Sequence, residues 1–180
     1  MREVLIFSTP VYKDSRGFFT ESYRADMAGI PKTFVQDNHS RSRRGVVRGL
    51  HFQWEPPMGK LMRVSFGEAF LVAVDIRKNS PTLGQWTGIT ASDMNGIQMW
   101  APAGFARGFC ALSDITDVQY KCTDMYNAEA ESNILWNDPD IGIAWPISES
   151  EIVVSDRDRT AQTLSGWLRS PQSEHFMYRG

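Results

Sequence analysis

The stretch "KLMRVSFGEAFLVAVDIR", residues 60–77, carries the strongest β-strand signal in the chain. In its first half Met62, Val64 and Phe66 alternate with Leu61, Arg63 and Ser65. Its second half is a nearly continuous apolar run. Both patterns are typical of β-strands. The turn dipeptide Gly67-Glu68 separates the two halves, so we predict that they form a β-hairpin.

Similar short runs continue the pattern through the rest of the chain. They are separated by Gly, Pro, Asn and Asp at intervals of about ten residues, the spacing expected of a β-sandwich or barrel. The runs are "QWTGITA", "GIQMWAP", "GFCAL", "DVQYKCT" and "NILWN". Only residues 21–29, which end at Gly29, and residues 155–164, which can begin at an N-cap on Ser155, look helical. We predict an all-β protein with a few short helices.

The length of 180 residues fits one domain, residues 1–180, which can bury a core without disulfides or metal. No repeat or linker indicates a second domain. Residues 169–180 are polar with scattered aromatics, and we expect either a loosely held tail or a partner contact. No run of eighteen apolar residues occurs, so we expect a cytoplasmic protein that does not bind membranes.

The formal net charge of -2 argues against a general nucleic-acid surface. A local basic cluster nevertheless suits a smaller anion, such as a phosphorylated ligand; it consists of Arg41, Arg43, Arg44 and Arg48. The two cysteines, Cys110 and Cys122, fall in predicted buried strands and lack zinc-ligand spacing. We interpret both as reduced and structural.

The three histidines decide whether a metal site is expected. A cytosolic β-barrel raises the cupin possibility, in which an HxH pair, a third His and a carboxylate hold a metal. Here "GLHFQ" around His51 lacks the second His, and His39 and His175 have no ligand spacing. We therefore expect no metal, which leaves His51 as either a hydrogen-bonded core residue or a metal-free acid–base group.

Two basic residues near His51 bear on that choice. Arg48 lies three positions before it, on the opposite face of a regular strand unless Gly49 bends the strand so that both point inward. Lys60 follows the turn-rich "PPMG" and can begin the next strand beside His51. An ammonium there would stabilise negative charge on a substrate oxygen, although a solvated strand end is an equal alternative.

The segments "VQYKCTDMYN" and "SDRDR" supply further candidates. The phenol of Tyr120 or Tyr126 can donate a proton to a carbanion, or the ring can stack on a base or sugar, or each can be an ordinary core aromatic. Either Asp156 or Asp158 can hydrogen-bond an imidazole and fix its tautomer, or both can cap the start of a helix.

Read together and in order from about residue 5 to about residue 165, a series of motifs resembles the dTDP-4-dehydrorhamnose 3,5-epimerase family. The motifs are "DSRGFFTE", "QDNHSRS", "VVRGLHFQ", "MGKLMRV", "VAVDIRKNSPTLGQW", "PAGFARGF", "YKCTDMY", "ILWNDPDIGIAWP" and "SDRDR". The resemblance implies a metal-free cupin-type jelly roll without a cofactor, usually a homodimer that exchanges N-terminal strands. It implies the substrate dTDP-4-dehydro-6-deoxy-D-glucose and a product that leads to dTDP-L-rhamnose.

The resemblance also assigns roles to residues. It implies that His51 is the general base with Asp158 as its partner, that Lys60 lies by the C4 oxygen, and that Tyr120 is the acid on the opposite face. Tyr126 matches an aromatic that stacks on thymine. Positions that contact the nucleotide or sugar, some of them donated by a neighbouring subunit, are matched by Arg16, Glu21, Gln36, Asp37, Asn38, Arg48 and Glu131.

Two residues depart from the family pattern. Arg107 stands where "GFAHGF" usually has His, and Arg157 stands where a Lys normally precedes the aspartate. Both keep or add positive charge near the expected ligand, so we count them among the substrate-binding residues. The two departures leave open an epimerase that inverts C3 alone or one that accepts another nucleotide sugar. A rival from another class is a non-catalytic cupin-like protein that binds a nucleotide sugar.

Overall fold

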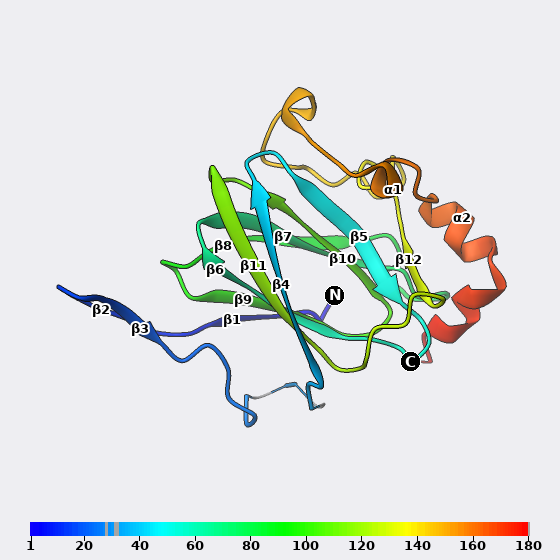
Figure 1. Ribbon diagram of the computed structural model, residues 1–180. Coiled ribbons are helices and arrows are strands. Elements are labelled where there is room, and N and C mark those ends of the chain that lie inside the picture. The colour runs from blue at the N-terminus through cyan, green and yellow to red at the C-terminus, as the bar shows by residue number, and fades with distance from the viewer. Residues whose placement is uncertain (28, 31–32, 180) are drawn as a thin grey trace.

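The computed structural model describes residues 1–27, 29–30 and 33–179. Two five-stranded antiparallel sheets pack face to face, in the strand orders β1-β9-β6-β11-β4 and β12-β5-β10-β7-β8, and β2 and β3 form a separate hairpin (Figure 1). The strands are β1 Leu5–Ser8, β2 Val11–Asp14, β3 Gly17–Thr20, β4 Gln36–Arg43, β5 Val47–Gln53, β6 Lys60–Phe66, β7 Glu68–Asp75, β8 Trp86–Ser92, β9 Ile97–Ala101, β10 Phe105–Ala111, β11 Ile115–Cys122 and β12 Glu131–Asn133. The predicted all-β sandwich is confirmed; apart from the β2–β3 hairpin, the described strands form two sheets rather than one closed barrel.

The stretch 60–77 forms two strands, but the predicted hairpin is wrong. β6 pairs with β9 and β11, whereas β7 pairs with β8 and β10. Gly67, with φ of +75°, turns the chain from one sheet to the other. As a result Met62 of β6 and Leu71 of β7 meet inside the sandwich. A hairpin would have left both apolar faces on one sheet, and stacking the sheets buries them against each other.

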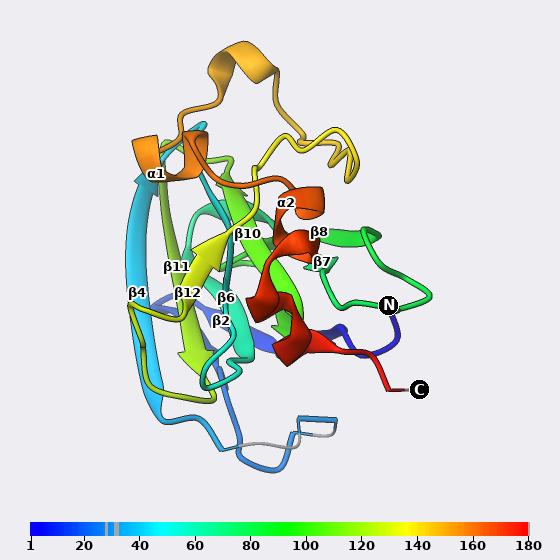
Figure 2. The same ribbon diagram turned by 90° about the vertical axis from the view of Figure 1, so that its right-hand side faces the viewer.

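The continuous apolar run of β7 arises because this strand is covered on both faces. Leu71 and Ala73 belong to the core between the sheets. Val72 and Val74 belong to a second core outside the sheet, together with Trp167 of the C-terminal helices. Figure 2 shows these helices beside the β5, β10 and β7 side of the sandwich. Because both faces of β7 are buried, successive side chains in the middle of the strand are all apolar instead of alternating between apolar and polar.

The helices are short: η1 Glu149–Glu151, α1 Asp156–Arg159, α2 Leu164–Arg169 and η2 Pro171–Phe176. The helix predicted over 155–164 begins as expected after an N-cap at Ser155, but it ends at Arg159, and Thr163 caps a new helix. The helix predicted over 21–29 is absent from its described residues; position 28 lies outside them. There Tyr23 packs edge-on against Phe34, so tertiary contacts replace helical ones. None of the described helices is long and apolar enough to cross a membrane.

The C-terminal segment is packed, contrary to the expectation of a loose tail. Phe176 is buried and contacts the rings of Phe52 and Trp167. The ring of Tyr178 lies 5.0 Å from the Arg77 guanidinium. Position 180 lies outside the described residues. The segment therefore completes the second core.

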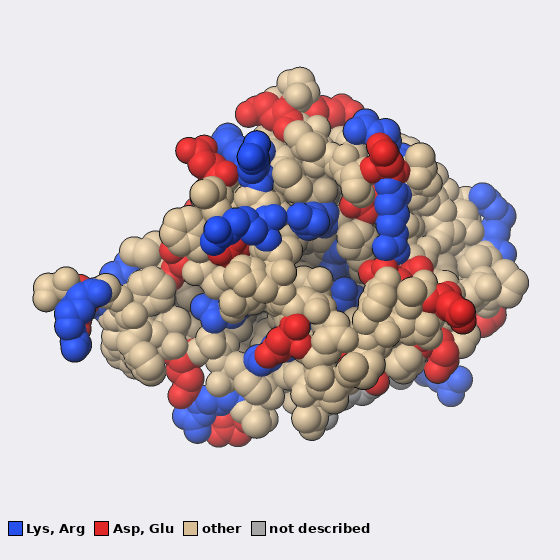
Figure 3. All heavy atoms as spheres, in the orientation of Figure 1, with Lys and Arg blue, Asp and Glu red and all other residues tan. Residues whose placement is uncertain are grey.

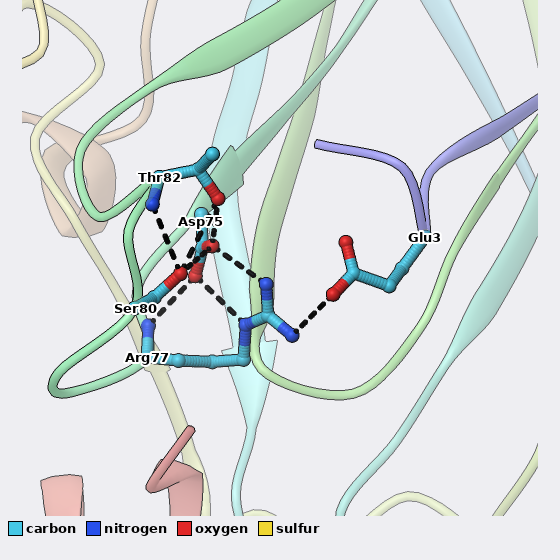
Figure 4. Close-up of polar contacts among 5 residues, drawn as sticks. All are labelled: Glu3, Asp75, Arg77, Ser80 and Thr82. Carbon is cyan, nitrogen blue, oxygen red and sulfur yellow. Dashed lines mark hydrogen bonds and ion pairs between the residues drawn. The ribbon is translucent and has the colours of Figure 1, made fainter. Parts of the chain in front are cut away.

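A buried polar cluster ties the N-terminal segment to the end of β7 (Figure 4). The carboxylate of Asp75 accepts hydrogen bonds from Arg77 (2.7 and 2.9 Å), Ser80 (2.6 Å) and Thr82 (2.7 Å). Burial alone would raise the pKa of Asp75, but these bonds hold it below its ordinary value. Arg77 also donates to Glu3 at 3.0 Å. Because the polar groups of this cluster are hydrogen-bonded to one another, the role of the cluster is structural.

Candidate active site

A bulge in β5 aims two basic side chains into the sandwich. His51 pairs with Arg107 of β10, and Arg48 pairs with Phe109, so β5 uses one residue more than β10 over this interval. Gly49 adopts φ of +141°, and a Cβ there would lie 2.7 Å from the Gly108 Cα. Arg48 and His51 consequently line the same cavity, as the bent-strand alternative predicts.

The cavity lies between the two sheets and has a volume of about 220 Å³. Its lining residues are Ser40, Arg48, His51, Lys60, Met62, Arg107, Gly108, Phe109, Tyr120 and Glu131. An adjoining hollow of about 350 Å³ shares Lys60, Tyr120 and Glu131 with it and adds Gln36, Asn38 and Tyr126 among others. Figure 3 shows Lys and Arg side chains gathered around a hollow in this face of the molecule. The site thus has two parts: the 220 Å³ cavity, called the deep end below, and the polar 350 Å³ hollow, called the outer part.

His51 and Asp158 form a hydrogen-bonded dyad, with 2.6 Å between Nε2 and Oδ1. The buried carboxylate, on α1, also accepts from Asn133 Nδ2 and Ser155 Oγ, each at 3.0 Å. Burial alone would raise the pKa of Asp158, but the bonds to His51, Asn133 and Ser155 hold it below its ordinary value. An ionised carboxylate only accepts, so His51 donates from Nε2 and keeps Nδ1 as its basic nitrogen. Asp156, by contrast, is exposed in the first turn of α1.

Lys60 and Tyr120 lie together on the sheet opposite His51. Lys60 is the first residue of β6, and its Nζ lies 4.9 Å from the centre of the Tyr120 ring. Burial, reinforced by the nearby charge of Arg107, lowers the pKa of Lys60 to about 8. Burial raises the pKa of Tyr120, so its phenol remains protonated at neutral pH. The deep end therefore offers a base, a cation and an acid.

Arg107 emerges from β10 beside His51 and is buried. Its Nη2 donates to the carbonyl oxygens of Met58 and Pro102, the latter at 3.0 Å. Burial lowers the pKa of Arg107 to about 10, so the guanidinium still carries its charge at neutral pH. It adds a second cation to the deep end of the cavity.

The outer part of the site is held by a polar chain of contacts. Arg157 forms an ion pair with Glu131 at 2.7 Å, and the Tyr126 hydroxyl donates to the same carboxylate at 3.2 Å. Gln36 accepts from the backbone of Tyr126 at 2.9 Å and donates to Asn38 at 3.1 Å. These contacts leave the ring of Tyr126 54% exposed, so its face is open to a flat ligand.

Several predicted ligand contacts lie away from this cavity. Arg16 is at the tip of the β2–β3 hairpin, which projects from the body in Figure 1, and pairs with Asp14. Glu21 follows that hairpin and lines neither part of the site. Asp37 pairs with Lys121 at 2.9 Å and lines a neighbouring pocket, which shares Asn38 and Tyr120 with the outer part of the site.

The predicted basic cluster does not form one anion site. Only Arg48 of the four arginines lines the cavity. Arg41 is bound to Asp117 at 2.7 Å. Arg44 donates to the Leu112 carbonyl. Arg41 and Arg43 lie on the exposed face of β4, Arg44 lies in the turn that follows, and Arg48 lies on β5, which explains the separation.

The cysteines and histidines complete the account of the predicted residues. Cys110 and Cys122 are free and buried, as predicted. His39 lies 3.4 Å from Asp117, and His175 lies 3.3 Å from Glu55. Among the described residues no group of three or more His, Cys, Asp or Glu side chains is placed to hold a metal ion.

The sequence analysis missed Asn133, which orients the Asp158 carboxylate. Asn133 lies opposite His51 in the pairing of β12 with β5. Its amide also donates to the carbonyl of Arg157 at 3.1 Å. No local pattern in "NILWN" indicates this role, because it depends on a pairing between strands far apart in the chain.

Sequence comparison identifies the relatives of this chain. The dTDP-4-dehydrorhamnose 3,5-epimerase family matches residues 1–166. A dTDP-4-dehydrorhamnose 3,5-epimerase from Methanothermobacter thermautotrophicus is 51% identical over 89% of this chain and 89% of that protein. Another, from Neisseria gonorrhoeae, is 47% identical over 95% of this chain, which spans only about half (52%) of that protein's length.

Structure comparison agrees. The dTDP-6-deoxy-D-glucose-3,5-epimerase from Legionella pneumophila, solved in complex with dTDP-4-keto-L-rhamnose, matches with a TM-score of 0.92 and 45% identity. The match covers 100% of this chain and 96% of that chain. The sandwich is accordingly a cupin-type jelly roll, as expected. On the match to residues 1–166 and these identities, the chain belongs to the dTDP-4-dehydrorhamnose 3,5-epimerase family.

Proposed function

We propose that this protein is an isomerase that inverts C3 and C5 of dTDP-4-dehydro-6-deoxy-D-glucose and yields dTDP-4-dehydro-L-rhamnose. Family membership gives the reaction class. The observation that carries the proposal is the His51–Asp158 dyad, which opens into the same cavity as Lys60 and Tyr120. A metal-free proton transfer next to a ketone needs a base, a cation and an acid, and this cavity contains all three.

In the proposed mechanism the C4 ketone acidifies the hydrogens on C3 and C5. His51 removes one of them as a proton, the electron pair moves onto the C4 oxygen as an enolate, and Lys60 stabilises that charge. The Tyr120 phenol then returns a proton to the same carbon from the opposite face, which inverts the centre. Solvent reprotonates Tyr120 and deprotonates His51, so no atom is gained or lost. Asp158 stabilises the imidazolium that forms on His51.

The outer part of the site suits the nucleotide. The exposed ring of Tyr126 offers a face on which thymine stacks. Arg48 and Arg157 present guanidinium groups between this ring and the deep cavity, and such groups bind diphosphate oxygens in pairs. Gln36 and Asn38 line the same region. Binding energy from the nucleotide would hold the sugar in register with His51.

The N-terminal hairpin supports a homodimer in which N-terminal strands are exchanged. β2 and β3 pair only with each other, and Tyr12, Phe18 and Phe19 on them are 63%, 45% and 69% exposed. An isolated two-stranded hairpin is only marginally stable in water, so these aromatics call for a covering surface. A second copy of the chain would cover these aromatics, and Arg16 and Glu21 of the first copy would then reach the site of the second.

We also propose a cytoplasmic location and no nucleic-acid or membrane partner. The two buried cysteines remain free thiols, which is usual for a reducing compartment. The net charge of -2 gives no general attraction to polyanions.

Arg107 gives a reason to retain the C3-only alternative, because a guanidinium at the deep end changes the space and charge around the sugar. One experiment separates the candidates: incubation with dTDP-4-dehydro-6-deoxy-D-glucose in deuterated water, followed by NMR at C3 and C5. Label at both carbons supports the proposal. Label at C3 alone shows a monoepimerase, and binding without label shows a non-catalytic protein. As a control, His51→Ala is expected to slow exchange by about 10²-fold or more.

A further inference from the structure

Arg107 is a buried cation without a carboxylate partner. Its residue exposure is 3%. Nη2 donates to two backbone carbonyls, but Nε and Nη1 have no hydrogen-bond partner among the described residues. Buried guanidinium groups are almost always paired, since burying an unpaired charge is costly. The fold therefore maintains an unsatisfied donor at considerable cost.

Arg77 shows how the same protein satisfies an arginine whose role is structural. That guanidinium bonds Asp75 and Glu3 and lies 4.5 Å from the Phe105 ring centre. The group beside Arg107 is the thiol of Cys122, whose pKa is raised by burial. A neutral thiol supplies no countercharge. Among the described residues, therefore, no carboxylate neutralises the charge of Arg107.

The position of Arg107 indicates which part of a ligand would meet this charge. Arg107 lies directly opposite His51 in the pairing of β10 with β5, and directly opposed residues project to the same face. Both line the 220 Å³ cavity with Lys60 and Tyr120. Lys60 and Arg107 thus place two cations around one small cavity. A small cavity with two cations at one end favours an oxygen that gains negative charge.

We propose that Arg107 is a second cation of the active site, whose charge stabilises the substrate oxygen that becomes the enolate oxygen when His51 removes the proton. This role rests on the proposed epimerase function. The carbonyls of Met58 and Pro102 fix the guanidinium in advance, so no reorganisation accompanies the reaction. The diphosphate belongs instead to Arg48 and Arg157, which are exposed.

The test compares Arg107→Met and Arg107→Gln with the wild-type protein. Two quantities are measured: the rate of deuterium exchange at C3 and C5 with saturating dTDP-4-dehydro-6-deoxy-D-glucose, and the Kd for dTDP, which lacks the sugar. Loss of this preorganised charge is expected to slow exchange by about 10²-fold. The Kd for dTDP should change less than about threefold, because the nucleotide does not reach Arg107.

Two controls keep the result interpretable. Arg169→Met removes an exposed arginine of α2 that lines neither part of the site, and it should leave both quantities within about threefold of wild type. Thermal unfolding reports whether each variant is folded. If the methionine variant does not fold, the glutamine variant still offers an amide donor to the Met58 carbonyl.

The outcomes are distinct. A folded Arg107 variant that exchanges label at the wild-type rate would overturn the role of Arg107 and leave the epimerase function intact. A weaker Kd for dTDP with an unchanged rate would also overturn it, in favour of a diphosphate contact. Wild-type protein that exchanges no label would overturn the proposed function and this role together.

Discussion

The substitution Asp158→Asn tests whether the dyad acts through charge. The asparagine amide has nearly the same shape as the carboxylate, and it can retain the present hydrogen bonds. Its oxygen can accept from His51 and Asn133, and its nitrogen can donate to Ser155 Oγ, which sits 3.0 Å from Oδ2. The variant therefore removes one negative charge and little else.

The expected magnitude follows from the 2.6 Å contact between His51 and Asp158. In the transition state His51 gains a proton, and the neighbouring carboxylate then forms a charge-assisted hydrogen bond. Such a bond contributes about 1.5–3 kcal/mol. At about 1.4 kcal/mol for each tenfold change in rate, kcat/KM should fall by about 10- to 150-fold.

The assay is kcat/KM for epimerisation together with deuterium exchange at C3 and C5, since both require His51. Ser155→Ala is the matched control. It removes one partner of Asp158 and the N-cap of α1, so it should lower stability by about 1 kcal/mol while the charge remains. A folded Asp158→Asn variant within threefold of wild type would refute the reasoning. A loss of about 10⁴-fold would also refute a purely electrostatic role, because it would indicate that the imidazole takes the wrong tautomer.

Three further substitutions test other parts of the protein. Lys60→Met should slow exchange by about 10²-fold or more. The pKa of Lys60 falls from 10.5 in the unfolded chain to about 8 in the folded protein, so between these pH values the unfolded chain binds more protons and wild-type stability rises with pH. Lys60→Met should therefore have a higher Tm than wild type at pH 7. A difference in Tm that does not shrink toward pH 10 would contradict this. Tyr120→Phe should slow net inversion more than exchange, measured by NMR in one sample, since abstraction survives when protonation fails; equal losses would show that the acid is misassigned. Asp75→Ala should cost about 3–5 kcal/mol in urea unfolding because Arg77 loses its buried partner, whereas Asp26→Ala, in an exposed ion pair, should change nothing measurable.

Much of the fold could be read from local patterns. Period-two alternation and short apolar runs identify residues 60–66 and 68–75 as strands, because side-chain direction in a strand is a local property. The partners of these strands could not be read in the same way. The turn at Gly67 is compatible with a hairpin and with a corner between sheets, and the choice depends on burying two apolar faces against each other.

The candidate site shows the same division. The motifs identify His51, Asp158, Lys60 and Tyr120 through family resemblance. In the structure His51, Lys60 and Tyr120 line one cavity, and Asp158 is hydrogen-bonded to His51. Asn133 could not be found in this way, since it acts through the pairing of β12 with β5. Arg16 matches the family pattern, yet its place on the projecting hairpin separates it from the cavity of its own chain.

The sequence by itself determined the β-class, the family and the chemical groups available for the reaction, because these follow from residue types and from periodicities within a few positions. Only the tertiary structure decided which sheet each strand joins and whether Arg107 has a partner among the described residues. The reason is physical: an ion pair or a hydrogen bond forms between groups a few Å apart in space, and the chain brings such groups together through strand pairings that no local pattern encodes.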